Sequence, residues 1–347
     1  MKLHKIFKMK TQISVKGGAL VLVLAVISVL SAVVVEFAYT TRVGMNLGAT
    51  YRDYTIAESI ARSGIEIAKK LLIKDLENDK AQGDMADFRI SPEEMPSDDE
   101  LWSQSESLAQ MFNPFKNGSI LLKIDDEDGK FNLNMITGMD GSRNENMVRL
   151  TKKLFENLEV KDSEEITNKI ADWIDGDLEG EWEDGAKNAQ IETLTELGLL
   201  NGIDYLEYIR IAGAAPDLPV FSTYLTVFPS RRYVEGAQAI NWQININTAP
   251  PQVIMAIVKD ADEEAANAIV KDIEKQHMGS PNAFTSYLSG LGLELEPGVS
   301  VSVRSDTFSV ISEGIAGGGA GGVSCIIRAV FQRYDDGKVE VLYWRVD

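Results

Sequence analysis

The sequence is poor in cysteine and histidine. Its 347 residues include one cysteine, Cys325, and two histidines, His4 and His277. A single cysteine closes no disulfide within the chain, so packing has to stabilise the fold. His277 lies in "EKQHMGSPNAF", where glycine and proline predict a surface loop. Zinc or serine–histidine chemistry would depend on that one side chain, and we expect no enzyme.

Basic residues are also in deficit. The chain has 34 lysines and arginines against 53 aspartates and glutamates, a net charge of −19. Five lysines and no acid precede Gly17, so the chain after Gly17 carries −24. This excess of acid repels nucleic-acid phosphates and argues against a nucleic-acid partner. It suits cations that prefer oxygen ligands, such as calcium.

One long apolar run is present near the N-terminus. The 19 residues from Gly17 to Val35 carry no charge, and as a helix they would span roughly 28 Å, close to the hydrocarbon thickness of a bilayer. Because the lysines precede the run, the positive-inside rule predicts a cytoplasmic N-terminus and sends the bulk of the chain across the membrane. A plain, uncut signal anchor satisfies the same pattern.

The start of this run carries a second pattern. Gly17 and Gly18 directly follow Lys16. A basic leader, a glycine and a long apolar helix resemble type IV prepilins and type II secretion pseudopilins, which a prepilin peptidase cuts after the glycine. The resemblance implies loss of residues 1–17 and retention of the anchor, with Gly18 as the first mature residue and a site of methylation. Most members carry glutamate at the fifth mature position, where this chain has Leu22.

Hydrophobic periodicity predicts elements of both kinds along the chain. The helix is expected to continue to about residue 76, with a stripe of small residues at helical spacing, before a polar connection over residues 77–107. Alternation across Asp128-Gly129 predicts a β-hairpin over residues 118–134. Three alternating strands after residue 306 predict a meander. Short helices are predicted over residues 145–160, 162–174, 191–200, 249–258 and 262–276.

These elements predict an α+β fold. A long N-terminal helix would pack on a small antiparallel sheet, with a large all-α domain inserted between the first hairpin and the C-terminal strands. The expected segments are a leader over 1–17; an N-terminal helix over 18–76, membrane-spanning to about 36; a sheet domain over 77–135 and 301–347; and an inserted helical domain over 136–300.

Several motifs together carry a family resemblance. They are "DEDGKFNLN" (126–134), "IADWIDGDLEGEWEDGAKN" (170–188), "TLTELGLLNGID" (193–204) and "ININTAPPQVIMAIV" (244–258). In this order, and followed by the final meander, they resemble the K-type minor pseudopilins of bacterial type II secretion (general secretory pathway protein K). That family lacks the mature glutamate, so Leu22 agrees with it. "GEWEDGAKN" departs from the usual order of the family's Gly-Ala-Glu-Asp-like stretch.

The resemblance implies a non-enzymatic subunit at the tip of the pseudopilus, which initiates or caps its assembly. The implied partners are I- and J-type minor pseudopilins, other pseudopilins, the inner-membrane secretion platform and the prepilin peptidase. The implied location is the bacterial inner membrane, single-pass, with most of the chain periplasmic. A tip subunit has no neighbour above it to pair with a carboxylate in the membrane, so Leu22 avoids a buried charge. The alternative is that Leu22 simply faces lipid.

The acidic stretch from Asp172 to Asp184 predicts a cation site. Carboxylates that alternate along a glycine-containing turn can converge on calcium, although the spacing is not that of an EF-hand. The K-type family resembles a calcium binder in this region. The candidate ligands are Asp175, Asp177, Glu179, Glu183 and Asp184. A solvated acidic loop is the alternative, and a glycosidase acid–base pair finds no aromatic cleft in the sequence.

The stretch "ININTAPPQVIMAIV" suggests a second function. Thr248 can cap a helix that begins at Pro250-Pro251, which is similar to the helix–hairpin–helix element of DNA-binding proteins. The alternative function is therefore a membrane-anchored helix–hairpin–helix DNA-binding protein. The hairpin glycines are missing and acidic "KDADEEAANAI" follows, so a structural use of the motif is favoured.

Overall fold

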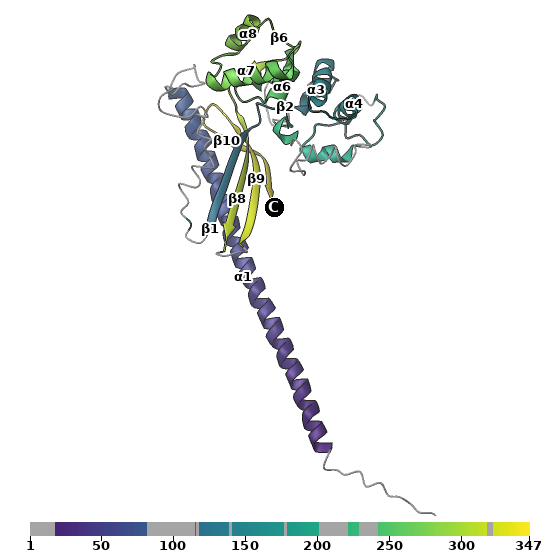
Figure 1. Cartoon of the computed structure of the whole chain (residues 1–347), viewed down its shortest axis with the longest axis vertical. Helices are drawn as coiled ribbons and strands as arrows, with labels where there is room; N and C mark the ends of the chain where they lie inside the picture. Colours follow the sequence, from purple (N-terminus) through teal and green to yellow (C-terminus); the bar gives the residue numbers. More distant parts are fainter. Residues whose placement is uncertain are drawn as a thin grey trace, which may run out of the picture. The chain divides into compact units, whose positions relative to one another are not determined.

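The computed structural model describes residues 18–81, 115, 118–138, 141–176, 179–200, 221–228, 242–317 and 322–347. Figure 1 shows these elements along the chain. The expected leader over 1–17 and most of the expected connection over 77–107 lie outside the described residues.

Two compact units divide the chain, residues 1–56 and residues 57–347. The helix α1 (Gly18–Ala81) contributes to both. Every residue from Gly18 to Arg52 is exposed within the molecule. By length and composition, this helix contains a window apolar enough to cross a membrane. From Ala57 onward the predicted stripe is buried, including Ala61, Ile65, Ala68 and Leu72.

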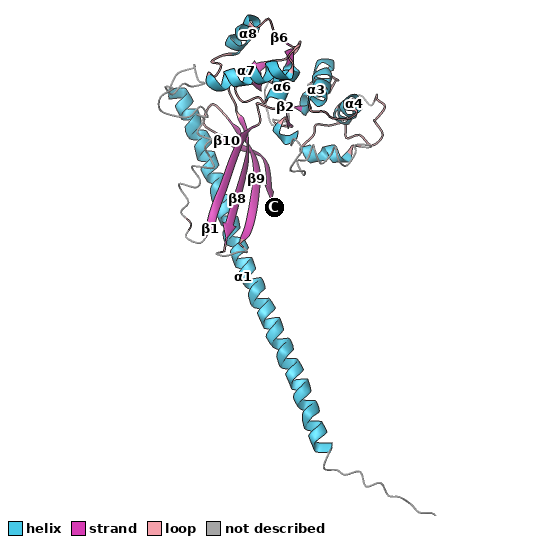
Figure 2. Cartoon of the chain, in the orientation of Figure 1, coloured by secondary structure: helices cyan, strands magenta, loops and turns pink. Residues whose placement is uncertain are grey.

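The second unit contains a four-stranded antiparallel sheet in the order β1-β8-β9-β10 (Figure 2). The strands are β1 (Gly118–Asp126), β8 (Thr307–Ala316), β9 (Val323–Arg333) and β10 (Val339–Val346). Alternate residues face α1 and form a core with it, among them Ile120, Leu122, Phe308, Ile327 and Phe331. The period-2 alternation of these strands produces this one-sided burial. The predicted C-terminal meander and the α+β class are confirmed.

The predicted β-hairpin is wrong in its second arm. After the turn that follows β1, the strand β2 (Phe131–Asn132) pairs in parallel with β3 (Leu225–Thr226) instead of returning along β1. Phe131 is fully buried and packs edge-to-face on Trp242, with ring centroids 5.0 Å apart. Both rings belong to the core of the inserted block, so burial of Phe131 outweighs a hairpin contact. Phe131 thus packs in the second hydrophobic core and not on the four-stranded sheet.

A second hydrophobic core lies in the inserted block, which we call the helical block (residues 131–304). Its helices are η1 (Leu133–Ile136), α3 (Glu145–Asn157), α4 (Ser163–Ile174), η2 (Leu194–Leu199), η3 (Phe221–Thr223), α6 (Pro251–Ile257), α7 (Glu263–Lys275) and α8 (Pro281–Gly290). Its remaining short strands are β4 (Ile244–Asn245), β5 (Val258–Lys259), β6 (Glu294–Leu295) and β7 (Val301–Ser302).

The predicted helices over 145–160, 162–174, 249–258 and 262–276 are confirmed as α3, α4, α6 and α7. The stretch 191–200 instead contains the 3₁₀ helix η2. The helix α8 falls partly where a loop was expected. Ser280 caps it by accepting the N–H of Ala283 at 3.1 Å, and Pro281 stands in its first turn.

Two asparagine pairs organise the helical block in the same way. In "FNLN", Asn132 Oδ1 accepts the N–H of Asn134, whose side chain bonds Ile191 and Val227. In "ININ", Asn245 Oδ1 accepts the N–H of Asn247. The amide of Asn247 bonds Met278 and Val303. Each second asparagine thus bonds the residue that follows the partner strand, β3 or β7, and also a third segment of the block. A primary amide can do this because it donates and accepts at once.

Candidate metal centre

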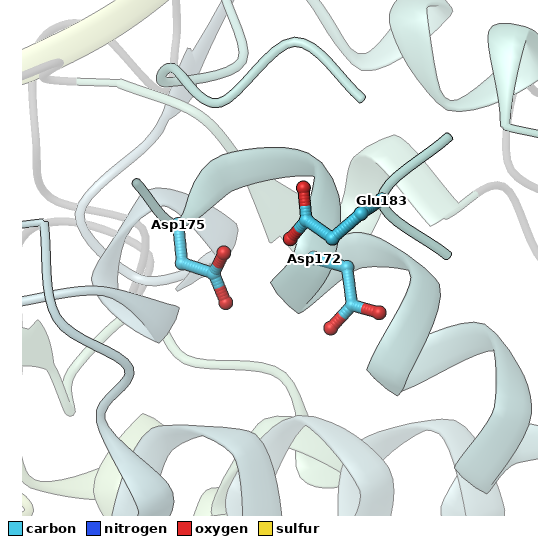
Figure 3. Close-up of side chains that lie close together, drawn as sticks. All are labelled: Asp172, Asp175 and Glu183. Carbon is cyan, nitrogen blue, oxygen red and sulfur yellow. The ribbon is translucent and has the colours of Figure 1, made fainter. Parts of the chain in front are cut away.

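Three carboxylates of the helical block lie together at the end of α4 (Figure 3). Asp172 occupies the last turn of α4 and Asp175 is its C-terminal cap, while Glu183 comes from the following loop. One oxygen of each lies within 4.8 Å of the others. Asp172 and Asp175 are buried, and Glu183 is partly buried. The helical spacing of three residues places the two aspartates on one face of α4.

Asp172 is held in place by neighbours on two sides. Its Oδ1 accepts Arg143 Nη1 at 3.3 Å, and its Oδ2 accepts the backbone N–H of Trp182 at 2.9 Å. A Cβ atom built on Gly180 would lie 2.5 Å from Asp172 Cγ, too close for any side chain. Gly180 therefore permits the acidic loop to cross directly over the carboxylate of Asp172.

The loop is fixed further by Trp182. The ammonium of Lys169, on α4, lies 4.5 Å from the centre of the Trp182 ring and pairs with Glu165 at 2.6 Å. A cation over an aromatic face is attracted by the ring quadrupole. This contact holds the loop that carries Glu183 against the helix that carries Asp172.

The charge of the cluster makes it suitable for a cation. At an effective dielectric constant of 20, two negative charges 4.8 Å apart repel by about 3–4 kcal/mol. Arg143 offsets part of this repulsion through Asp172. Within the described residues, both carboxylate oxygens of Glu183 are buried and accept no hydrogen bond. A hard cation such as calcium, which prefers carboxylate oxygens, fits a donor set of this kind.

The structure brings together two of the predicted ligands, Asp175 and Glu183. The third member, Asp172, lies in the predicted acidic stretch but was not among the chosen ligands. Its distance of three residues from Asp175 on a helix was the signal that could have found it. Glu179 and Asp184 are exposed and lie outside the group. Their exposure is what the alternative interpretation, a solvated acidic loop, predicts for these two residues. Asp177 lies outside the described residues.

The predicted processing residues lie at the start of the chain. Gly18 is the first residue of α1, and Leu22 lies in its second turn. Both are exposed, Leu22 to 65%. Gly17 lies outside the described residues. The predicted capping role of Thr248 is wrong: Pro250 is the N-cap of α6, and the hydroxyl of Thr248 donates a hydrogen bond to the carboxylate of Asp126.

Comparison with known proteins agrees with this architecture. Two family models described as type II secretion system protein K match residues 129–213, which include the carboxylate cluster, and residues 244–304. Type II secretion system protein K of Pseudomonas aeruginosa is 26% identical over 333 residues, which cover 94% of this chain and 91% of that protein. Both comparisons carry the same description, and the chain is similar to type II secretion system protein K over 94% of its length.

A solved structure has a similar fold. The chain is similar to one in the crystal structure of the GspK-GspI-GspJ complex from the enterotoxigenic Escherichia coli type 2 secretion system. The TM-score is 0.56 at 15% identity, covering 88% of this chain and 99% of that chain. The matched models and the relative assign this chain to type II secretion as a minor pseudopilin, a structural component. Its apolar α1 is consistent with a single-pass membrane anchor.

Proposed function

We propose that this minor pseudopilin occupies the tip of the pseudopilus, where it initiates or caps assembly for protein export across the outer membrane. The observation that carries the proposal is the insertion between β1 and β8. These strands are paired along their whole length, yet the helical block with its own core separates them in the chain. A subunit within a fibre has neighbours on both sides along the axis, and a block of this size favours an end position.

The proposed partners at the tip are I- and J-type minor pseudopilins. Other pseudopilins, which form the rest of the fibre, and the inner-membrane platform are further proposed partners. The solved complex named GspK-GspI-GspJ supports this choice, because its chain shares the fold described above. The anchor would lie in the inner membrane with residues 1–17 in the cytoplasm and the second unit in the periplasm. The five lysines of the leader support that orientation.

A prepilin peptidase would remove residues 1–17 and leave Gly18 as a methylated N-terminus. Leu22 would then be the fifth mature residue. In the membrane a carboxylate at this place needs a cationic partner, since an unpaired charge there is costly. An apolar Leu22 imposes no such requirement on the first subunit of a fibre.

We also propose that Asp172, Asp175 and Glu183 hold calcium. When bound, the cation would neutralise the mutual repulsion of the three carboxylates. Asp172 and Asp175 would position it at the end of α4, and Glu183 would fasten the acidic loop to it. The buried oxygens of Glu183 support this assignment.

The test is expression of the full chain with an active or an inactive prepilin peptidase, followed by intact-mass measurement and co-purification with I- and J-type subunits. The proposal expects loss of residues 1–17 only with the active enzyme, and a stable complex of three subunits. Gly17→Val is the matched control, because it should block cleavage and leave the fold of residues 57–347 intact. An uncut chain beside an active peptidase, or no binding of either partner, would overturn the proposal.

A further inference from the structure

Three distant segments meet beside a pair of aspartates, at the junction of the sheet with the helical block. The pair, Asp126 and Asp128, lies where β1 ends. The carboxylate of Asp126 accepts the hydroxyl of Ser305 at 2.5 Å, from the segment before β8. It also accepts the side-chain amide of Asn245, at 3.4 Å, from the end of β4, and the hydroxyl of Thr248, from the segment after β4. Asp126 thus links the sheet directly to the second asparagine motif.

Asp128 makes the complementary contacts with its side chain and its backbone. Its Oδ2 accepts the backbone N–H groups of Asp306 and Thr307 at 2.6 and 2.9 Å. Its carbonyl accepts the N–H of Asn245 at 2.9 Å, and its own N–H bonds Asp126 Oδ1 at 2.8 Å. A Cβ on the adjacent Gly129 would lie 3.0 Å from the carbonyl carbon of Thr248, so the segments are also in close backbone contact.

The two carboxylates resist being charged together. Burial raises the pKa of Asp126 above its ordinary value, although hydrogen bonds from Ser305 and Thr248 oppose the rise. Burial and then the negative charge of Asp126 raise the pKa of Asp128 well above its ordinary value, against two backbone N–H groups. Asp128 keeps part of its surface in water. This contact with water limits the rise in its pKa but does not reverse it.

The hydrogen bonds favour Asp128 as the carboxyl group that holds the proton. Both oxygens of Asp126 accept hydrogen bonds, which stabilises Asp126 as the ionised member of the pair. The bonds to Asp128 fall on Oδ2, which leaves Oδ1 to carry the proton while Oδ2 keeps its two N–H groups. A carboxylic acid can donate one hydrogen bond and still accept others.

Other charged groups around the pair have ion-pair partners of their own. The turn contributes Glu127 and Lys130, which form an ion pair of 2.5 Å. The segment before β8 contributes Arg304, which pairs with Asp306 at 3.1 Å and with Asp335 at 2.5 Å. Arg333 of β9 bonds the carbonyl of Ser305 and pairs with Asp75 of α1. The contacts from the β4 side are the neutral Asn245 and Thr248. Protonation of Asp128 is therefore the change of charge that matters most here.

We propose that Asp126 and Asp128 form a protonation-sensitive latch between the sheet and the helical block. The latch is closed while the pair carries one negative charge. It loosens when both carboxylates are ionised, because their repulsion then opposes the contacts with Ser305 and Thr248. This inference concerns the fold of residues 57–347 and does not depend on a tip position.

The sign of the pH dependence follows from linkage. Above the ordinary aspartate pKa of 3.8, the unfolded chain has released the proton that the folded pair retains. The folded state then binds more protons, so stability falls as the pH rises toward the raised pKa of the pair. Below pH 3.8 the folded and the unfolded states both bind this proton. Its contribution to stability is then fully present and no longer changes with pH. The junction is thus expected to be tighter at mildly acidic pH than at pH 8.

The test compares the full chain with its D128N variant in detergent micelles by thermal unfolding between pH 5 and pH 8. The introduced asparagine is isosteric with aspartate, can accept the same two N–H groups and never ionises. The two proteins should melt together at pH 5. At pH 8 the variant should melt higher, by about 2–4 °C for each unit by which the fold raises the pKa. D125N, one residue from Asp126 on an exposed pair with Lys123, is the matched control and should follow the wild type.

A second measurement localises the effect. Hydrogen exchange of residues 244–248 and 305–310, corrected for the intrinsic pH dependence of exchange, should accelerate toward pH 8 in the wild type by about tenfold for each unit of pKa shift. It should stay constant in D128N. A constant melting difference between D128N and wild type at all pH values would overturn the latch, as would pH-independent exchange in the wild type.

Discussion

Arg333 of β9 and Asp75 of α1 form a buried ion pair of 2.7 Å, with their side chains only 3% and 5% exposed. Arg333 also donates to the carbonyls of Leu72 and Ser305, at 3.1 and 2.8 Å, and lies over the ring of Phe308. One guanidinium therefore fixes the end of α1 to the sheet and to the segment that enters β8. Its planar set of five donors is what allows this.

Asp75→Asn should destabilise the second unit strongly. The substitution removes the counter-charge and leaves the guanidinium buried, and breaking a buried pair in this way costs about 3–5 kcal/mol. The measurement is urea unfolding of the full chain in detergent, followed by tryptophan fluorescence. Lys123→Gln breaks an exposed pair with Asp125 and should cost less than about 1 kcal/mol. Equal losses in the two variants would contradict the structural role of Arg333.

Gly64→Ala should separate α1 from the sheet. A Cβ on Gly64 would lie 2.6 Å from Ile120 Cδ1 and would collide with Ser312 Oγ. Overpacking of this kind costs about 1–3 kcal/mol, more than the gain in helix propensity of about 1 kcal/mol. Gly48→Ala is the control in the same helix, since nothing lies within 4 Å of its Cβ. Melting temperature should fall in the first variant and not in the second.

Asn134→Asp should disrupt the first asparagine motif. The buried amide of Asn134 donates to the carbonyls of Ile191 and Val227, both at 2.9 Å. An aspartate has no such donor at neutral pH and would turn a carboxylate toward two carbonyls, at a cost of about 3 kcal/mol or more. Asn267→Asp loses one exposed bond to Glu263 and should be nearly neutral. If the two variants lose similar amounts of unfolding free energy, the proposed role of Asn134 in joining these segments is refuted.

Glu183→Gln should weaken calcium binding. If calcium binds the cluster, a concentration of 100 times its Kd stabilises the wild type by about 2.7 kcal/mol, visible as a rise in melting temperature that EDTA reverses. Loss of one carboxylate should remove most of that rise. Glu181→Gln changes an exposed acid of the same loop and should preserve it. The assignment fails if calcium leaves the wild type unchanged, or if both variants lose the response equally.

Much of the fold could be predicted from residue periodicity. The strands of the sheet alternate because one face packs on α1, and α3, α4, α6 and α7 show helical spacing for the same reason. The helix α8 was missed because its capping residues, serine and proline, are equally typical of a loop. The second arm of the hairpin was misassigned because β2 is two residues long. Its partner, β3, lies far away in the sequence, where local pattern gives no information.

The candidate site shows the same division. Acidic composition was sufficient to locate the region in which Asp175 and Glu183 lie together. It could not choose among seven neighbouring carboxylates, since the choice depends on which of them the loop buries. Asp172 belongs to the cluster because Gly180 allows the loop to cross over its carboxylate. Sequence spacing alone does not predict that contact.

By itself the sequence determined the long apolar helix, the α+β class, the resemblance to type II secretion system protein K and the region of the acidic cluster, because each follows from local composition, periodicity or ordered motifs. The tertiary structure alone decided which carboxylates meet, that Thr248 bonds Asp126 instead of capping α6, and that Asp126 and Asp128 lie at the junction with the helical block. The first of these facts depends on which side chains the acidic loop buries. The other two depend on contacts between segments more than 100 residues apart, and a linear sequence does not specify those distances.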